Sequence, residues 1–188
     1  MTAKSPPTRR KFISAGDEID YLYHKVLFWF YGRENRRRAL PFGERLEKLL
    51  QKEAPRPEGI FAEGCWSLVC ELKGDLAGAI KHRENEIRLI KRLHQISLNT
   101  PDQDYVLKTY GFDDLSDRLD LLAILYHDAG DLDRAIRLLE ESRQLCRTHR
   151  ISFDGNDILK DYLAERKRVS GEGKARKRLP GRAKRSAG

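Results

Sequence analysis

Apolar residues recur every three or four positions over most of residues 14–168, which predicts helices rather than strands. Two apolar-rich runs, Phe61–Leu72 and Ala79–Ile96, are joined by a short polar turn, and the runs Leu119–Tyr126 and Ala135–Cys146 repeat that arrangement. No stretch alternates apolar and polar residues between turn signals, as the strands of a hairpin do. We therefore expect an all-α fold.

The two turns are similar in sequence. Gly74-Asp75-Leu76-Ala77-Gly78-Ala79-Ile80 and Gly130-Asp131-Leu132-Asp133-Arg134-Ala135-Ile136 agree at five of seven positions. Glycine permits the left-handed conformation that ends one helix, and aspartate caps the next helix by accepting hydrogen bonds from its free N–H groups. The small alanine then lets two antiparallel helices approach closely. Each pair of runs is predicted to form a helix–turn–helix.

This helix–turn–helix resembles the tetratricopeptide repeat, which has small residues and a turn glycine at fixed places in a pattern of about 34 residues. In the second repeat the matching residues are Leu122, Ala123, Tyr126, Gly130, Asp131, Ala135, Ile136, Leu139 and Ser142. In the first repeat they are Trp66, Ser67, Cys70 and Ala79. That repeat departs from the pattern at Arg83 and Glu86, where apolar and small residues belong, which affects its expected packing against a following repeat.

A third, degenerate repeat is predicted upstream. Its apolar positions are Tyr23, Val26, Leu27 and Phe30 on one helix and Ala39, Leu46, Leu49 and Leu50 on the next. Glu34 takes the place of the turn glycine, and Pro41 is expected in the first turn of the second helix. The repeats cover about 17–52, 60–96 and 116–149. An insert at 97–115 is predicted to hold a short helix from Thr100-Pro101 to Gly111.

The resemblance implies a short tetratricopeptide-like α-solenoid of two to three helical hairpins. A final helix over about 156–168, capped by Asn156 or Asp157, is expected to close the stack with the apolar stripe Ile158, Leu159, Tyr162 and Leu163. Together these helices form one predicted domain over 14–168. Residues 1–13 and 169–188 contain few apolar residues, so we expect a flexible basic arm and a disordered basic tail.

The first helices of tetratricopeptide repeats line a concave groove that binds a protein or peptide. Carried over by position, that groove holds Tyr21, His24, Phe28, Tyr31, Glu71, Asp117, Asp120, Ile124, His127 and Asp128. Its aromatic and acidic side chains favour a basic, partly apolar peptide. The alternative is that the aromatic residues pack in the core against the inserted segment.

Charge is concentrated at one end of the chain. The 188 residues carry a net charge of +8, and residues 165–188 hold ten basic and two acidic side chains, so the remainder is neutral. Contact with nucleic-acid phosphates is therefore an alternative function, although the tail lacks aromatic residues for base stacking. A tail that only improves solubility is the other interpretation. The basic residues are Arg166, Lys167, Arg168, Lys174, Arg176, Lys177, Arg178, Arg182, Lys184 and Arg185.

Signatures of enzymes and metal sites are absent from the sequence. It contains no GxxxxGK[ST], GxGxxG or GxSxG motif. Cys65, Cys70, Cys146 and His149 have the residue types of a zinc site, but the first two lie on different sides of one predicted helix. The run 81–86 alternates in charge, which indicates a solvated helix face with His82 and Glu86 as a surface pair. We expect no catalysis, cofactor or metal.

Composition also bears on location. No apolar run approaches the about 20 residues of a membrane-spanning helix, and the N-terminus lacks the apolar region of a signal peptide. Three cysteines do not suit a disulfide framework. We expect a cytoplasmic adaptor or scaffold that binds a protein or peptide without chemistry of its own. Self-association is a third hypothesis, because a short stack exposes apolar ends.

Overall fold

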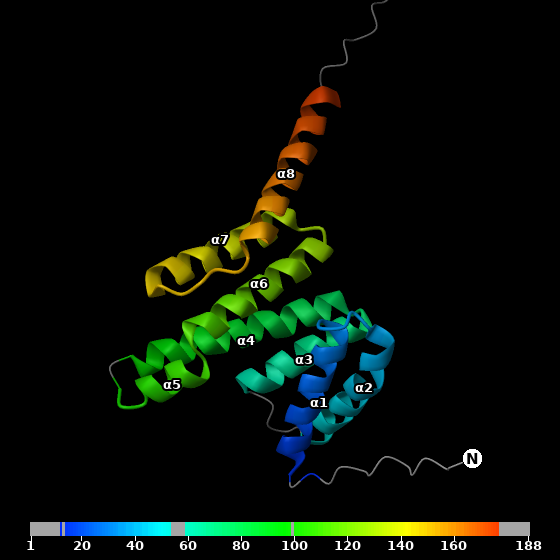
Figure 1. Ribbon diagram of the computed structural model, residues 1–188, viewed down its shortest axis with the longest axis vertical. Helices are drawn as coiled ribbons and strands as arrows, with labels where there is room; N and C mark the ends of the chain where they lie inside the picture. Colours follow the sequence, from blue (N-terminus) through cyan, green and yellow to red (C-terminus); the bar gives the residue numbers. More distant parts are fainter. Residues whose placement is uncertain (1–11, 13, 54–58, 99, 177–188) are drawn as a thin grey trace, which may run out of the picture. The chain divides into compact units, whose positions relative to one another are not determined.

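The computed structural model describes residues 12, 14–53, 59–98 and 100–176, and every regular element in these ranges is an α-helix (Figure 1). The helices are α1 Ala15–Phe30, α2 Arg36–Glu53, α3 Ile60–Lys73, α4 Leu76–Ser97, α5 Gln103–Thr109, α6 Phe112–Asp128, α7 Leu132–His149 and α8 Asn156–Arg176. The predicted all-α fold is confirmed. No helix in these ranges is both long and apolar enough to cross a membrane.

The chain divides into an N-terminal unit, Met1–Lys91, and a C-terminal unit, Arg92–Gly188. The boundary falls within α4, where the helical pattern of the sequence has no break. Each unit has buried apolar residues of its own. The two units are described separately below.

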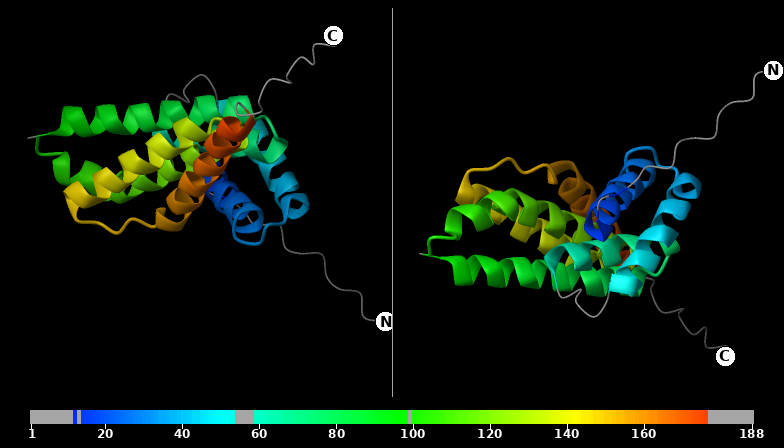
Figure 2. Two further views of the ribbon diagram at one scale, coloured as in Figure 1. Left: turned by 90° about the horizontal axis from the view of Figure 1, so that it is seen from above. Right: turned by 90° about the horizontal axis from the view of Figure 1, so that it is seen from below.

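In the N-terminal unit, α2 packs against both α1 and α3, and both views of Figure 2 show α1 beside α2. The core contains Leu22, Val26, Ala39, Leu46, Leu50, Cys65, Leu68, Val69 and Leu72. Gly43 allows α2 to approach α3 closely, because a Cβ atom at that position would lie 2.3 Å from Cδ2 of Leu72. At the start of α1, Ser14 and Asp17 form a capping box, each side chain accepting from the backbone N–H of the other.

The turn between α1 and α2 explains why Pro41 does not lie in the first turn of its helix, where it is expected. Glu34, at the position of the missing glycine, has φ +48° and so adopts the left-handed conformation. Asn35 then caps α2 by accepting from the Arg38 N–H at 3.0 Å. Because this cap starts the helix at Arg36, Pro41 lies in its second turn rather than its first. Proline has no N–H, so the carbonyl of exposed Arg37 lacks its usual helical donor.

Both glycine–aspartate turns form as predicted. Gly74 and Gly130 have φ of +82° and +83°. Asp75 accepts from the Gly78 N–H and Asp131 from the Arg134 N–H, each at 3.0 Å. The alanines that follow, Ala79 and Ala135, are fully buried. In the first turn the helices are close enough for Ser67 Oγ to donate to the Ala79 carbonyl at 2.9 Å.

The C-terminal unit is built around α6 and α7, which both views of Figure 2 show side by side. Its core contains Leu115, Leu119, Leu122, Ala123, Leu125, Tyr126, Ala135, Ile136 and Leu139. The helix α5 lies in the insert where a short helix is expected and contributes the buried side chain of Val106. Gly111, the predicted end of that helix, is the N-cap of α6.

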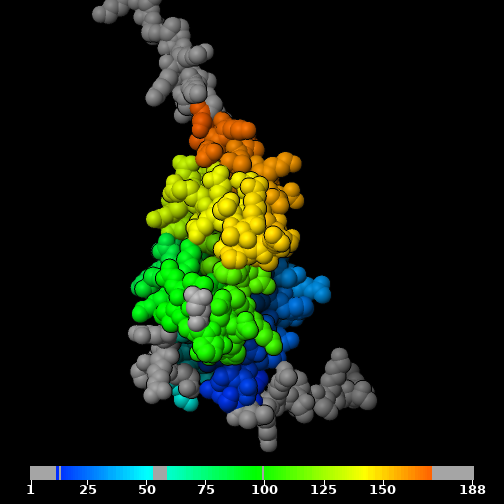
Figure 3. All heavy atoms as spheres, turned by 90° about the vertical axis from the view of Figure 1, so that its left-hand side faces the viewer, coloured from blue at the N-terminus to red at the C-terminus, as the bar shows by residue number. Residues whose placement is uncertain are grey.

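The last helix packs against α7, and Figure 3 shows α8 in orange beside α7 in yellow. Leu159 and Tyr162 of the predicted stripe are buried, with Ile158 and Leu163 half-buried. Neither predicted cap is the N-cap: Asn156 is the first helical residue, and its amide donates to the Phe153 carbonyl at 2.9 Å. The Leu159 N–H instead bonds to the carbonyl of Gly155.

The end of α8 also differs from the expectation. The helix runs to Arg176, so residues 169–176 of the predicted disordered tail are helical. A helix already docked through Leu159 and Tyr162 extends at low cost, because each added residue gains a backbone hydrogen bond without a new nucleation step. Residues 177–188 of the tail, and the predicted arm 1–13 apart from Phe12, lie outside the described residues.

Candidate functional site

The predicted groove residues of the N-terminal unit lie on α1, at its C-cap Tyr31, and on α3. Tyr31 and Glu71 meet, with the tyrosine hydroxyl donating to the carboxylate. Burial and this carboxylate raise the pKa of Tyr31 well above its ordinary value. His24 is exposed and lies 3.4 Å from Asp20 on the same helix. Phe28 is 45% exposed.

Tyr21 has a different environment from the other α1 aromatics. Its ring packs 5.3 Å from that of Phe12 and lines a pocket of about 280 Å³. The pocket lies between α1 and α2 and is also lined by Glu18, Leu22, Pro41, Phe42 and Arg45. Tyr21 is therefore not brought together with Tyr31 and Glu71, whose contact involves α3.

The predicted groove residues of the C-terminal unit all lie on α6. Asp117 and Asp128 are exposed, whereas Asp120, Ile124 and His127 are half-buried. The His127 ring stacks on Tyr162 with centroids 4.2 Å apart, and its Nε2 lies 3.0 Å from Glu165. His127 is thus engaged by α8. A groove that combines residues of both units stays a prediction.

An arginine–aromatic cluster, consisting of Phe28, Trp29, Arg33 and Arg38, lies where α1 ends and α2 begins (Figure 1). The guanidinium carbon of Arg33 is 5.3 Å from the centroid of the Phe28 ring, and that of Arg38 is 4.8 Å from the Trp29 ring. The two rings contact edge to face at 5.0 Å. Because cation–π attraction extends to about 6 Å, the four planar side chains form one continuous set of contacts.

The arginines of this region are exposed. Arg33, Arg37 and Arg38 are exposed, and none is in an ion pair within the described ranges. Arg36 differs, because its Nε donates to the Leu72 carbonyl at 2.8 Å and so joins α2 to the end of α3. The first turn of α2 contains no acidic residue. Cations are unfavourable at that end of a helix, so the arginines do not serve helix stability.

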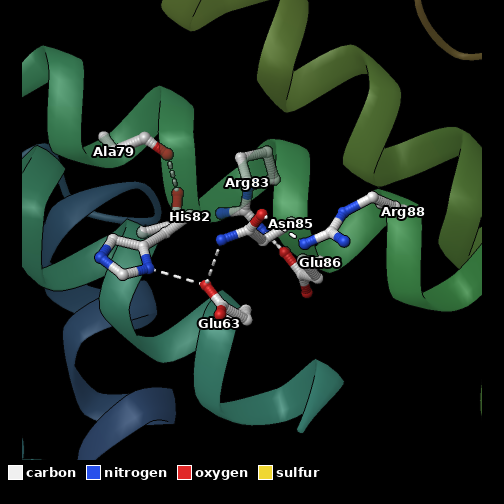
Figure 4. Close-up of polar contacts among 8 residues, drawn as sticks. Glu63, Ala79, His82, Arg83, Asn85, Glu86 and Arg88 are labelled. Atoms are coloured by element: carbon white, nitrogen blue, oxygen red, sulfur yellow. Dashed lines mark hydrogen bonds and ion pairs between the residues drawn. The ribbon is translucent and has the colours of Figure 1, made fainter. Parts of the chain in front are cut away.

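A buried polar cluster occupies the contact between α3 and α4 (Figure 4). Arg83 and Glu86 are each 2% exposed, and the guanidinium donates to the carboxylate. Glu86 fits because Gly64 faces it: a Cβ atom on that glycine would lie 2.6 Å from Glu86 Oε1. Beside them, Glu63 accepts from Asn85 at 3.5 Å and lies 2.7 Å from His82 Nδ1.

The expectation of a solvated face over 81–86 is wrong for Arg83 and Glu86. Ala79, Arg83, Glu86 and Ile90 follow the spacing of one helix face, and all four are buried. The expected surface pair of His82 with Glu86 is also wrong, since His82 contacts Glu63 and stacks on the Trp66 ring. The repeat pattern indicates the burial of positions 83 and 86, because it requires apolar and small residues there, where the helix faces its neighbour.

Of the arginine–aromatic cluster, Phe28 is a predicted groove residue, whereas Trp29, Arg33 and Arg38 are not among the predicted site residues. Its signal in the sequence is four arginines within positions 33–38, directly after the aromatic residues 28–31. Alternation of basic and aromatic side chains is typical of nucleic-acid-binding surfaces. Net charge alone points to the basic tail, because the tail carries more positive charge than the four arginines at 33–38.

The cysteines of the N-terminal unit lie in environments that oppose thiolate formation. Burial raises the pKa of Cys70 to about 11 and that of Cys65 well above its ordinary range. The thiolate is the form that binds metal or acts as a nucleophile.

The predicted nucleic-acid contacts of the C-terminal segment are described in part. Arg166, Lys167 and Arg168 are exposed on α8, and Arg166 lies 3.8 Å from Asp133. Lys174 and Arg176 belong to the same helix. Lys177, Arg178, Arg182, Lys184 and Arg185 lie outside the described residues.

No protein-family model matches this chain, and no curated protein or solved structure matches it either.

Proposed function

We propose that this chain is a non-catalytic binding protein with a short tetratricopeptide-like arrangement of helical hairpins, and that its N-terminal unit binds a polyanionic partner. The observation that carries the proposal is the arginine–aromatic cluster together with exposed Arg37. The hairpin arrangement is supported by the two matching glycine–aspartate turns.

The charge of this surface determines the class of partner. A basic peptide, the partner favoured by the sequence pattern, would be repelled by Arg33, Arg37 and Arg38. Glu71, the acidic residue expected beside the α1 aromatics, already accepts the Tyr31 hydroxyl. Guanidinium groups donate in a planar fork that matches phosphate, sulfate and carboxylate groups. A partner carrying a series of such anions fits this surface best.

Salt elution from immobilised heparin, a sulfated polyanion, tests the proposal. We compare the full chain with the variant R33Q/R37Q/R38Q, which spares the structural Arg36. The matched control K48Q/K52Q/K81Q removes the same charge from other exposed positions of the N-terminal unit. Circular dichroism first checks that helix content is unchanged in both variants.

We expect the arginine variant to elute at clearly lower salt and the lysine variant to elute close to the unsubstituted protein. Removing an arginine that binds an anion reduces the salt dependence of binding. An equal shift in the two variants would mean that net charge alone controls retention, and the proposed surface would be wrong.

The second candidate function is contact with nucleic acid through the basic C-terminal segment. The observation in its favour is that Lys167 and Arg168 are exposed on α8 and form no ion pair in the part of the chain that the structure describes. This candidate uses residues separate from the arginine–aromatic cluster, so its test is separate as well.

A further inference from the structure

We propose that the arginine–aromatic cluster binds single-stranded nucleic acid, with phosphates held by its arginines and bases stacked on its planar side chains. The inference rests on the polyanion-binding function proposed above and identifies the class of polyanion. It concerns Phe28, Trp29, Arg33 and Arg38 of the N-terminal unit, with Arg37 beside them.

The first argument is the exposed aromatic surface. Phe28 is 45% exposed although it lies on a helix whose other face is well buried. A sulfated sugar or an acidic peptide needs only positive charge, and an exposed phenyl ring adds little to such a contact. A nucleic-acid base has a flat face that stacks on an aromatic ring or on a guanidinium plane. Single-stranded nucleic acid therefore uses both properties of the cluster.

The second argument is the arrangement of the arginines. Arg33 lies over the Phe28 ring and Arg38 over the Trp29 ring, and neither side chain makes a hydrogen bond or ion pair elsewhere in the described ranges. Stacking on a ring restricts a long side chain before any ligand arrives. Less conformational entropy is then lost when a phosphate binds. The N–H donors of both arginines remain available for that contact.

The third argument separates single strands from duplexes. In a duplex the bases are stacked on one another, so only phosphates and groove edges are accessible. The arginines would still bind those phosphates, but Phe28 would gain no partner. Base stacking on Phe28 predicts a preference for single strands that charge alone does not provide.

Fluorescence anisotropy of labelled oligonucleotides tests this inference. The probes are oligothymidylate and oligouridylate of about 12 nucleotides and a DNA duplex of equal length, each at about 50 mM salt. The test variant is Phe28→Leu, which keeps an apolar side chain and removes the aromatic face. The matched control is Phe61→Leu, at a phenylalanine of the same unit that is 40% exposed. Trp29 is left intact because it also packs against the core.

We expect Phe28→Leu to weaken single-strand binding about five-fold or more, the equivalent of one modest base–aromatic stack. Duplex binding and the salt of elution from heparin should change less than single-strand binding, because they lose only the ordering of Arg33 by the Phe28 ring. Phe61→Leu should behave like the unsubstituted protein. Comparison of the two single strands then shows whether DNA or RNA is preferred.

Three outcomes would overturn the inference, and the first two leave the proposed function intact. In the first, Phe28→Leu binds single strands as tightly as the unsubstituted protein while R33Q/R37Q/R38Q loses both heparin and oligonucleotide binding. In the second, an oligoglutamate peptide displaces the single strand at equal charge concentration, which would identify an acidic protein segment as the partner. In the third, the arginine variant matches the lysine control on heparin, and both proposals fail.

Discussion

Asp120 is a carboxylate held at the contact between α6 and α7. Burial raises its pKa to about 6, the nearby carboxylates of Asp117 and Asp154 add to the increase, and a hydrogen bond with Ser142 opposes it. Its Oδ1 atom has neither solvent contact nor a hydrogen-bond partner within the described residues. The folded protein therefore favours the protonated form of Asp120 more strongly than the unfolded chain does.

This shift predicts how Asp120 affects stability with pH. The pKa of Asp120 in the folded protein lies above its unfolded value of 3.8. Its contribution to the free energy of unfolding is therefore fully present below about pH 4 and is lost as pH rises to about 6. We expect Asp120→Asn to be more stable than the unsubstituted protein by about 1–3 kcal/mol at pH 7.5, with the difference disappearing near pH 4. Urea unfolding at the two pH values measures it.

The control for Asp120→Asn is Asp161→Asn, which removes one carboxylate from an exposed position of α8. If both variants show the same difference from the unsubstituted protein at both pH values, Asp120 does not titrate as described.

Among the helices, the hairpins α3–α4 and α6–α7 each pack one acidic side chain against a small residue, but on opposite helices. Arg83 and Glu86 of α4 correspond to Leu139 and Ser142 of α7, and Gly64 of α3 corresponds to Asp120 of α6. In α3–α4 the small residue, Gly64, is on the first helix and the carboxylate, Glu86, on the second. In α6–α7 the carboxylate, Asp120, is on the first helix and the small residue, Ser142, on the second. Each contact accommodates one acidic side chain because its partner residue is small.

The correspondence suggests a double-mutant cycle at the buried pair. Arg83→Leu leaves Glu86 buried without its cation, and we expect a loss of about 3–5 kcal/mol. The double variant R83L/E86S copies the residues of α7 and should be less destabilised than Arg83→Leu alone. Urea unfolding of both single variants, the double variant and the unsubstituted protein measures the coupling. Additive losses would show that the two side chains do not depend on one another.

Local signals explain why several elements could be predicted. The glycine–aspartate turns and the short helix in the insert depend on residues close in sequence, and each forms where expected. Element ends were predicted less well. Asn35 starts α2 early, so Pro41 is in the second turn, and α8 continues past 168 because a docked helix propagates readily.

At the scale of the whole molecule, positive charge occurs in two kinds of places. The excess of basic residues lies in 165–188, yet Arg33 and Arg38, near the end of α1 and the start of α2, contact aromatic rings. Net charge therefore does not identify the surface best suited to stacking. The C-terminal segment supplies charge alone, which predicts strong salt dependence and weak discrimination between single strands and duplexes.

A chain ending at Arg168 tests the part of that segment that follows residue 168. It retains Tyr162 and Glu165, which contact His127, and loses seven basic residues and one acidic residue. We expect duplex affinity to depend less steeply on salt between about 50 and 200 mM, because fewer phosphates are then neutralised by the protein. The effect of Phe28→Leu on single strands should persist in this shorter chain. An unchanged slope would exclude phosphate binding by residues after 168.

Helix periodicity, glycine conformation and aspartate caps act over a few residues, so the helical class and the two capped turns follow from the amino-acid sequence alone. The packing of the helices sets which charged side chains are buried and which aromatic rings are in contact with an arginine. Arg83 and Glu86 look solvated until α3 is packed against α4 with Gly64 beneath the carboxylate. Arg38 reaches Trp29 only because the turn at Glu34 brings α2 back along α1. These interactions depend on the relative placement of helices, which no short window of sequence specifies.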